Sequence, residues 1–362
     1  LLACAKSQMD AFCDPFFCPS ASENLNMREA MLYEKLEEQR VQCHLCAHRC
    51  VIRDQKRGIC GVRENQSGRL QSLVYARAIA RHVDPVEKKP LFHFQPGSRT
   101  YSIATVGCNF RCLFCQNADI SQMPRETKRI MGEQFPPEQV ILSARQSRCQ
   151  SISYTYTEPT IFFEYAYQTA KLAQAADMKN IFLTNGYMTP EALDSIQPYL
   201  DAANVDLKAF SNDFYKEQCG AKLAPVLESL RKLKSMGVWL EVTTLVIPNV
   251  NDSDRELMEI AEFIVELGPE TPWHVSRFHP TYMLKNTSST PVATLKRARE
   301  IGLQVGLHYV YTGNVPGDQG EKTLCHHCGG VLIDRFGFAT GHYAIKKGRF
   351  PDCQTPVGGV GM

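Results

Sequence analysis

From residue 101 onward, the apolar residues follow two alternating patterns, one typical of strands and one typical of helices. Short apolar runs with the residue types and flanking turns of strands occupy residues 101–106, 151–157, 180–185, 204–210, 238–247, 273–279 and 306–313. Longer segments with apolar residues at helical spacing lie between them, at residues 136–148, 159–178, 189–200, 224–236, 253–267 and 290–301. Strand and helix therefore alternate through most of the chain.

Residues at the ends of these helices support the assignment. Thr189 is suited to cap a helix that has Pro190 at its first position. Gly237 and Gly268 follow the last apolar positions of two other helices, where glycine commonly ends a helix. The pattern predicts about six strand–helix units.

Such units form an α/β fold with a parallel sheet, and we expect it to curl into a partial or full (β/α) barrel. A doubly wound open sheet is the alternative. We expect an N-terminal extension at residues 1–26, a Cys-rich N-terminal region at 27–100 and the barrel at 101–316. Residues 317–362 would form a small Cys-containing, ribbon-like segment.

Functional groups of such sheets gather at the carboxyl ends of the strands. Polar residues follow the predicted strands at this end: Cys108, Glu158, Asn185, Asp206, Lys208 and His279. We take these residues as candidates for one site.

Composition narrows the classes of function. A formal net charge of +2 in 362 residues indicates neither a polybasic nor a polyacidic partner, so a nucleic-acid substrate is disfavoured. No apolar run reaches the roughly 18 residues that a membrane helix needs. Fifteen cysteines are many, and most of them fall in short local groups, which favours metal ligation over disulfides.

One group, Cys108, Cys112 and Cys115, has the spacing C-x3-C-x2-C. Thiolates are the usual ligands of iron–sulfur clusters, and three of them leave one iron of a four-iron cluster open. An open iron can bind a substrate or cofactor, as a catalytic zinc does at its free position. A three-cysteine zinc site with a distant fourth ligand is the alternative.

With Phe114 before the last cysteine, this motif resembles the signature of the radical S-adenosylmethionine (radical SAM) superfamily. The resemblance implies a [4Fe-4S] cluster on Cys108, Cys112 and Cys115 whose open iron binds SAM. Reductive cleavage of SAM would then give a 5′-deoxyadenosyl radical that abstracts hydrogen from a substrate.

The resemblance extends to the other candidates. Glu158, in "YTEPT", matches the carboxylate that holds the SAM ammonium, although Tyr156 and Thr157 replace the glycines of the family. Asp206 matches a cation ligand of some activating enzymes, but it and Lys208 are also suited to pair with each other. His279 matches a position that often contacts the SAM ribose, and a satisfied core histidine is the alternative.

Two further cysteine groups flank the barrel. Cys43, Cys46, Cys50 and Cys60 follow C-x2-C-x3-C-x9-C, which indicates either zinc or an auxiliary iron–sulfur cluster. Cys325, Cys328 and Cys353 resemble a zinc ribbon that has lost one cysteine, with Phe350 in its place. His326, His327 or His342 would supply a fourth ligand, or the site is a metal-free remnant. Cys149 and Cys219 are interpreted as ordinary buried thiols.

From about residue 27 to residue 353, the chain is similar to the AmmeMemoRadiSam-system radical SAM enzymes, which are akin to pyruvate formate-lyase activating enzymes. Segments that support the similarity include "HVDPVEKKPLFHF" and "YTGNVPG". The resemblance implies SAM cleavage at a cluster and does not give the substrate. Our first hypothesis is modification of a protein or peptide, such as activation of a glycyl radical partner. A small-molecule or nucleic-acid substrate, or a non-catalytic metal-binding or electron-transfer protein, are the alternatives.

We expect electrons from a donor such as ferredoxin or flavodoxin. Oxygen-sensitive clusters and low-potential donors favour the cytoplasm. The opening residues Leu1, Leu2, Ala3 and Cys4 resemble the end of a lipoprotein signal, which would instead indicate an exported or lipid-anchored protein.

Overall fold

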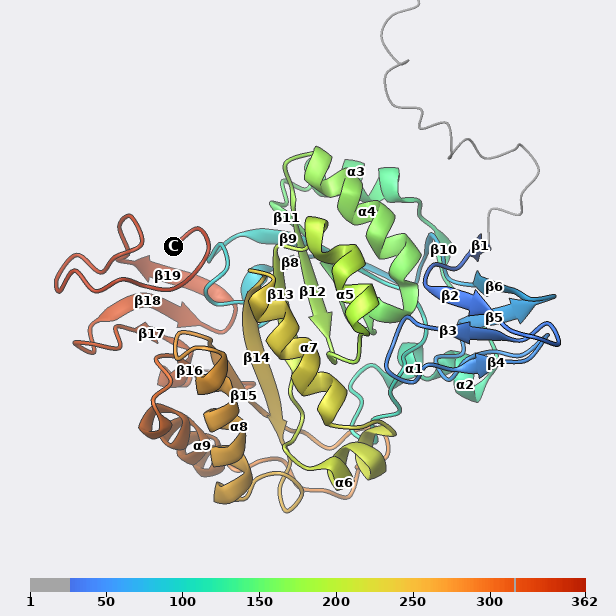
Figure 1. Cartoon of the computed structure of the whole chain (residues 1–362). Helices are drawn as coiled ribbons and strands as arrows, with labels where there is room; N and C mark the ends of the chain where they lie inside the picture. The colour runs from blue at the N-terminus through green and yellow to red at the C-terminus, as the bar shows by residue number, and fades with distance from the viewer. Residues whose placement is uncertain (1–26, 316) are drawn as a thin grey trace, which may run out of the picture.

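The seven apolar runs that the sequence predicts as strands lie side by side in one sheet (Figure 1). The computed structural model describes residues 27–315 and 317–362, so the predicted extension and its Leu1–Cys4 motif lie outside the described residues. These seven strands run parallel to one another. They are β9 (Arg99–Ala104), β11 (Ser151–Tyr154), β12 (Lys179–Thr184), β13 (Ala202–Asp206), β14 (Trp239–Val246), β15 (Trp273–Arg277) and β16 (Val310–Gly313). The predicted parallel sheet is confirmed.

The sheet is an open, partial barrel. At one edge β8 (Ala80–Pro85) pairs antiparallel with β9, and β16 forms the other edge. Within the described residues no strand pairing joins these two edges. Because β8 belongs to the sheet, the barrel begins inside the range expected for the Cys-rich N-terminal region.

The predicted helices are also confirmed, and they cover one face of the sheet (Figure 1). They are α3 (Pro137–Gln146), α4 (Phe163–Ala175), α5 (Pro190–Ile196), α7 (Ala224–Ser235), α8 (Asp254–Leu267) and α9 (Val292–Val305). Thr189 caps α5 by accepting a hydrogen bond from the amide of Ala192 at 3.2 Å. After α7, Gly237 adopts a φ of +75°, which glycine reaches without the strain of a side chain. Shorter helical turns are α1 (Ala118–Ser121), α2 (Met123–Glu126), α6 (Asn212–Phe214), η1 (Val86–Lys88), η2 (Pro159–Phe162), η3 (Gln197–Tyr199), η4 (Tyr215–Cys219) and η5 (Gln319–Glu321).

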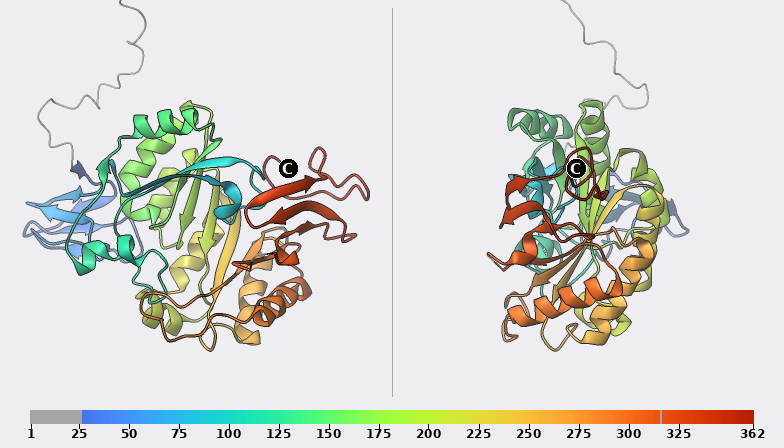
Figure 2. Two further views of the ribbon diagram at one scale, coloured as in Figure 1. Left: turned by 180° about the vertical axis from the view of Figure 1, so that it is seen from behind. Right: turned by 90° about the vertical axis from the view of Figure 1, so that its left-hand side faces the viewer.

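The other face of the sheet is crossed by the segment 86–97 (Figure 2). Its apolar residues Val86, Leu91 and Phe94 are buried against strand residues at the amino-terminal end of the sheet. Glu241, near the start of β14, accepts hydrogen bonds from the amides of Phe92 at 3.0 Å and His93 at 2.8 Å. This segment fills the floor of the partial barrel, so the opposite, carboxyl-terminal rim is left for a site.

Small antiparallel sheets lie at opposite sides of the main sheet (Figure 1). The N-terminal ones contain β1 (Arg28–Glu29), β2 (Tyr33–Lys35), β3 (Val41–Cys43), β4 (Val51–Ile52), β5 (Arg63–Gln66) and β6 (Arg69–Ser72), and β7 (Arg77–Ala78) pairs with β10 (Glu133–Gln134). The C-terminal one contains β17 (Thr323–Leu324), β18 (Val331–Phe336) and β19 (Ala339–Tyr343). Among the described helices, none combines the length and the apolar character needed to cross a bilayer.

Candidate functional site

The loop after β9 carries the three closely spaced cysteines. Its backbone is held by the segment at η4, where the carbonyl of Cys219 accepts from the amide of Arg111 at 2.9 Å and the carbonyl of Gln218 accepts from that of Leu113 at 3.0 Å. The sulfur of Cys115 lies 3.2 Å from the hydroxyl oxygen of Ser121. The loop is thus fixed by its neighbours and presents its thiols at the rim of the sheet.

Gly107 determines how closely this loop packs on the N-terminal region. Its φ is +105°, and an added Cβ would lie 2.7 Å from Cγ1 of Val62 and 3.2 Å from the carbonyl oxygen of Cys60. Glycine alone fits such a position without strain. The loop that carries Cys108 therefore lies directly against the backbone at Cys60.

Glu158, in the loop between β11 and η2, is buried and accepts four hydrogen bonds. Its Oε1 accepts from the hydroxyl of Thr160 at 2.5 Å, the amide of Thr160 at 3.2 Å and the hydroxyl of Thr184 at 2.7 Å. Its Oε2 accepts from the amide of Asn185 at 2.7 Å. Burial raises the pKa of Glu158, and these donors oppose the shift. The carboxylate joins the ends of β11 and β12.

Glu158 and Asn185 both lie beside Cys108. The pKa of the Cys108 thiol is raised well above its ordinary value, first by burial and next by the charge of Glu158. Asn185 donates from Nδ2 to Oδ1 of Asn109 at 2.7 Å, and the same nitrogen is 4.0 Å from the sulfur of Cys108. A carboxylate and an amide from two strands thus flank the first cysteine.

Asp206 and Lys208, at the end of β13, form an ion pair with Nζ 2.8 Å from Oδ2. The ammonium group is 5.8 Å from the centre of the Phe114 ring. The pKa of Cys112 is lowered, first by a hydrogen bond with Cys219 and then, against burial, by the charge of Lys208. Asp206 and Lys208 therefore pair with each other, which was the alternative to a cation site, and the pair lies beside the cysteine loop.

His279 is placed differently from the other candidates. It is exposed on the loop after β15, and its Nδ1 lies 3.3 Å from the hydroxyl oxygen of Ser289. Among the contacts of the described residues, none joins His279 to the cysteines or to Glu158. The alternative of a core histidine is wrong, because the side chain is exposed.

Two residues near the cysteines were not predicted to belong there. Cys219 is fully buried beside Cys112, at the end of a π-helical turn that carries no apolar periodicity. Tyr156 adopts a φ of +62°, and its carbonyl accepts from Nδ2 of Asn117 at 2.8 Å. The sequence marked Tyr156 as unusual, since it stands where the resemblance described above implies a glycine.

The thiols at 108, 112 and 115 suit a cluster better than a single ion. In the described chain, the ligand atoms of these three residues do not all lie within 4.8 Å of one another, as they would around one zinc. Thiolates are the usual ligands of a four-iron cluster, and the polar groups of Glu158 and Asn185 beside them suit a polar cofactor bound to it. The residues therefore fit the cluster and SAM.

The four N-terminal cysteines line one pocket. It is formed by Cys43, Cys46, Cys50 and Cys60 together with apolar residues and Arg63. The guanidinium of Arg63 donates from Nη1 to the sulfur of Cys43 at 3.1 Å. The structure thus brings together all four members of the predicted metal site.

The C-terminal cysteines also meet. The sulfur of Cys353 is 3.5 Å from that of Cys325 and 3.5 Å from that of Cys328. These three residues form a group whose ligand atoms lie within 4.8 Å of one another, and neither His326, His327 nor His342 joins it. Phe350, at the position of the lost cysteine, is buried.

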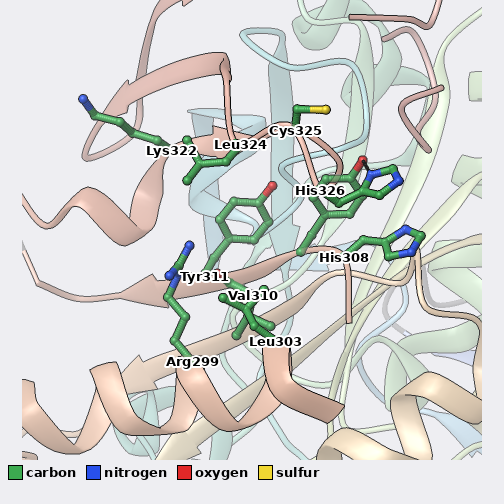
Figure 3. Close-up of a pocket in the computed structure, with 11 residues that line it drawn as sticks. Arg299, Leu303, His308, Val310, Tyr311, Lys322, Leu324, Cys325 and His326 are labelled. Atoms are coloured by element: carbon green, nitrogen blue, oxygen red, sulfur yellow. Dashed lines mark hydrogen bonds between the residues drawn. The ribbon is translucent and has the colours of Figure 1, made fainter. Parts of the chain in front are cut away.

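A cavity of about 190 Å³ lies next to this group, between α9, β16 and β17 (Figure 3). Arg299 and Leu303 face it from α9, Leu324 faces it from β17, and Lys322 lies just before β17. The ring of His326 stacks on that of His308 with centroids 4.0 Å apart. Because His308 and Val310 lie at the amino-terminal end of β16, this cavity is remote from the rim that carries Cys108.

Comparisons with known proteins point to one superfamily. The family described as the Radical SAM superfamily matches residues 102–264. The chain is 47% identical over 313 residues to uncharacterized protein MJ0808 of Methanocaldococcus jannaschii, across 86% of this chain and 92% of that protein. It is 22% identical to the pyruvate formate-lyase-activating enzyme of Staphylococcus epidermidis, across 51% of this chain and 76% of that protein. Among solved structures, Streptococcus suis SuiB bound to the precursor peptide SuiA gives a TM-score of 0.49 at 15% identity, across 64% of this chain and 52% of that chain.

Proposed function

Because the chain belongs to the radical SAM superfamily, we propose that it holds a [4Fe-4S] cluster on Cys108, Cys112 and Cys115 and cleaves SAM reductively. When bound, the cluster and SAM supply a 5′-deoxyadenosyl radical that abstracts hydrogen from a substrate. The observation that supports this most is the position of Glu158, which binds the amide of Asn185, while the side-chain nitrogen of Asn185 lies 4.0 Å from the sulfur of Cys108.

The residues of this chain would bind and orient SAM. Glu158 holds the SAM ammonium through Oε2, which accepts only one hydrogen bond from the described residues. Asn185 and the pair of Asp206 and Lys208 line the same rim. His279 lies on the loop after β15, at the same end of the sheet, and its proposed partner is the SAM ribose.

We propose a protein or peptide as the substrate, as in the activation of a glycyl radical partner. The similarity to a pyruvate formate-lyase-activating enzyme supports this proposal. A small molecule is the competing substrate class. Transfer of deuterium from labelled candidate substrates into 5′-deoxyadenosine would distinguish the two classes.

The chain would take electrons from a ferredoxin or flavodoxin, and we place it in the cytoplasm, where such donors act.

A zinc ion on Cys325, Cys328 and Cys353 would support the C-terminal ribbon, since sulfurs 3.5 Å apart suit one tetrahedral ion. Zinc content that falls by about one ion per chain in Cys353→Ala would support this site, and an unchanged content would contradict it.

Production of 5′-deoxyadenosine tests the central proposal. Anaerobically reconstituted protein with dithionite should convert SAM to this product, and Cys112→Ala should not, because the cluster loses one of its three ligands. The matched control is Cys149→Ala, which removes a buried thiol after α3. Equal product from wild type and Cys112→Ala would overturn the assignment.

A further inference from the structure

The four-cysteine pocket of the N-terminal region has features that a zinc site does not need. Its sulfurs come from β3 and the two turns that follow it, and its other walls are mostly apolar, including Leu45, Ile52 and Ile161. Such a pocket shields whatever the thiols bind from water.

The distance between the sulfurs distinguishes a site for a single metal ion from a site for a cluster. A tetrahedral zinc with Zn–S bonds of about 2.3 Å holds its sulfurs about 3.8 Å apart. The C-terminal Cys325, Cys328 and Cys353 meet that condition. Within the described chain, no three of the four N-terminal cysteines have sulfurs within 4.8 Å of one another. A cubane binds each thiolate at a different iron corner, which requires this wider spacing.

The three cysteines of the radical SAM motif provide a reference within the same chain. The sulfurs of Cys108, Cys112 and Cys115, which carry the superfamily motif, likewise do not all lie within 4.8 Å of one another. The N-terminal cysteines therefore resemble the cluster-type group of this chain and differ from its zinc-type group.

Arg63 provides a second, independent observation. Its side chain is buried and lines the pocket, and its guanidinium contacts Cys43, Glu164 and the carbonyl of Met31. Its Nε has no hydrogen-bond partner among the described residues. A buried N–H without an acceptor is costly. Zinc adds no acceptor beyond the thiolates, whereas the sulfides of an iron–sulfur cluster accept hydrogen bonds.

We propose that Cys43, Cys46, Cys50 and Cys60 bind a second [4Fe-4S] cluster, with all four irons ligated by protein and Arg63 as a buried hydrogen-bond donor to it. With no iron left open, this cluster has no position for SAM. Its function is to transfer electrons.

The second cluster would lie next to the first. The carbonyl of Cys60 abuts Gly107, immediately before Cys108. His48, between two of the N-terminal cysteines, has Nε2 2.9 Å from the carbonyl oxygen of Asn109. Thr160, which binds Glu158, also lines the four-cysteine pocket. A reduced flavodoxin would transfer one electron to the second cluster. The second cluster would then pass this electron to the first cluster and return to its oxidised state.

Iron and sulfide counts test the site without disturbing it. In the variant Cys108→Ala/Cys112→Ala/Cys115→Ala, anaerobic reconstitution should leave about four irons and about four sulfides per chain, with the absorption and electron paramagnetic resonance of a [4Fe-4S] centre. Loss of all iron, with zinc bound in its place, would overturn the second cluster. This result does not depend on SAM cleavage.

The transfer step rests on the proposed function and is tested separately. Cys46→Ala should lose SAM cleavage driven by reduced flavodoxin and keep cleavage driven by dithionite, a small reductant that reaches the first cluster directly. Cys149→Ala should keep both. Equal retention of both activities in Cys46→Ala, or equal loss of both, would overturn the electron-transfer role.

Discussion

Tyr156 shows how a single residue supports the site. The left-handed backbone at φ +62° costs a residue with a side chain roughly 1–2 kcal/mol, which glycine avoids. Here the side chain compensates, because its hydroxyl binds Asp84 and the ammonium of Lys89 lies 4.4 Å from its ring centre. Its carbonyl meanwhile accepts from Asn117, just past the cysteine loop. Tyr156 therefore ties the Glu158 turn to that loop.

Replacement of Glu158 by Gln should weaken SAM binding by about tenfold or more, since a charged hydrogen bond is worth about 1.5–3 kcal/mol. The check is equilibrium binding of SAM to anaerobically reconstituted protein. Thr184→Ser is the matched control, because it keeps the hydroxyl that binds Glu158. Unchanged SAM affinity in a Glu158→Gln protein with full iron content would contradict the role of this carboxylate.

At the scale of elements, the start of α5 has a double role. The hydroxyl of Thr189 caps the helix at Ala192, and it also donates to the carbonyl of His44 at 2.6 Å. Cys46 pairs with Met188 in an isolated bridge just before this cap. The beginning of α5 therefore docks the N-terminal cysteine region onto the barrel.

Thr189→Ala should destabilise the protein by more than Ser253→Ala, which removes a cap of α8 alone. A lost cap costs about 1 kcal/mol, and the lost bond to His44 adds about 1 kcal/mol. Urea denaturation measures the difference, and hydrogen exchange should show faster opening of residues 43–50 in Thr189→Ala. Equal destabilisation by both variants would show that Thr189 acts only as a cap.

Most of the sheet and its helices could be predicted from the sequence, because their apolar periods reflect burial on one or both faces. β8 was not predicted, because it lies at the edge of the sheet and its residues Arg81, His82 and Asp84 leave no periodic pattern of apolar residues. Cysteine spacing located the three thiol groups, but the spacing of sulfurs in space is a tertiary property. Cys219 was missed for the same reason, because only the fold brings it to Cys112.

At the scale of the whole molecule, one buried histidine joins distant parts of the chain. His93 is fully buried, with Nε2 2.6 Å from the hydroxyl of Tyr311 and Nδ1 2.6 Å from the carbonyl of Gly358. A neutral ring meets both contacts by accepting from Tyr311 and donating to Gly358. Burial lowers the pKa of His93 to about 4, against the opposing charge of Glu241.

This shift makes stability depend on pH. Between pH 6.5 and pH 4 the unfolded chain binds a proton at His93 that the folded chain does not, so stability falls as the pH falls. From pH 7 to pH 4.5 the loss from this group should be about 2 kcal/mol. Urea denaturation at the two pH values should show a smaller loss in His93→Gln than in wild type. The exposed His279→Gln should behave as wild type, and an unreduced loss in His93→Gln would contradict the assignment.

The pairing of residues 358–360 with the segment at His93 has a consequence for biosynthesis. The amide of Gln95 donates to the carbonyl of Val360 at 2.7 Å, and the amide of Val360 donates to the carbonyl of His93 at 2.8 Å. A ribosome that adds 5–20 residues per second needs roughly 13–53 s to travel the 265 residues from His93 to Gly358. Only in the last part of that interval, after Gly313, does the nascent barrel have every parallel strand but an unsealed floor, so this is the period in which we expect it to depend most on chaperones.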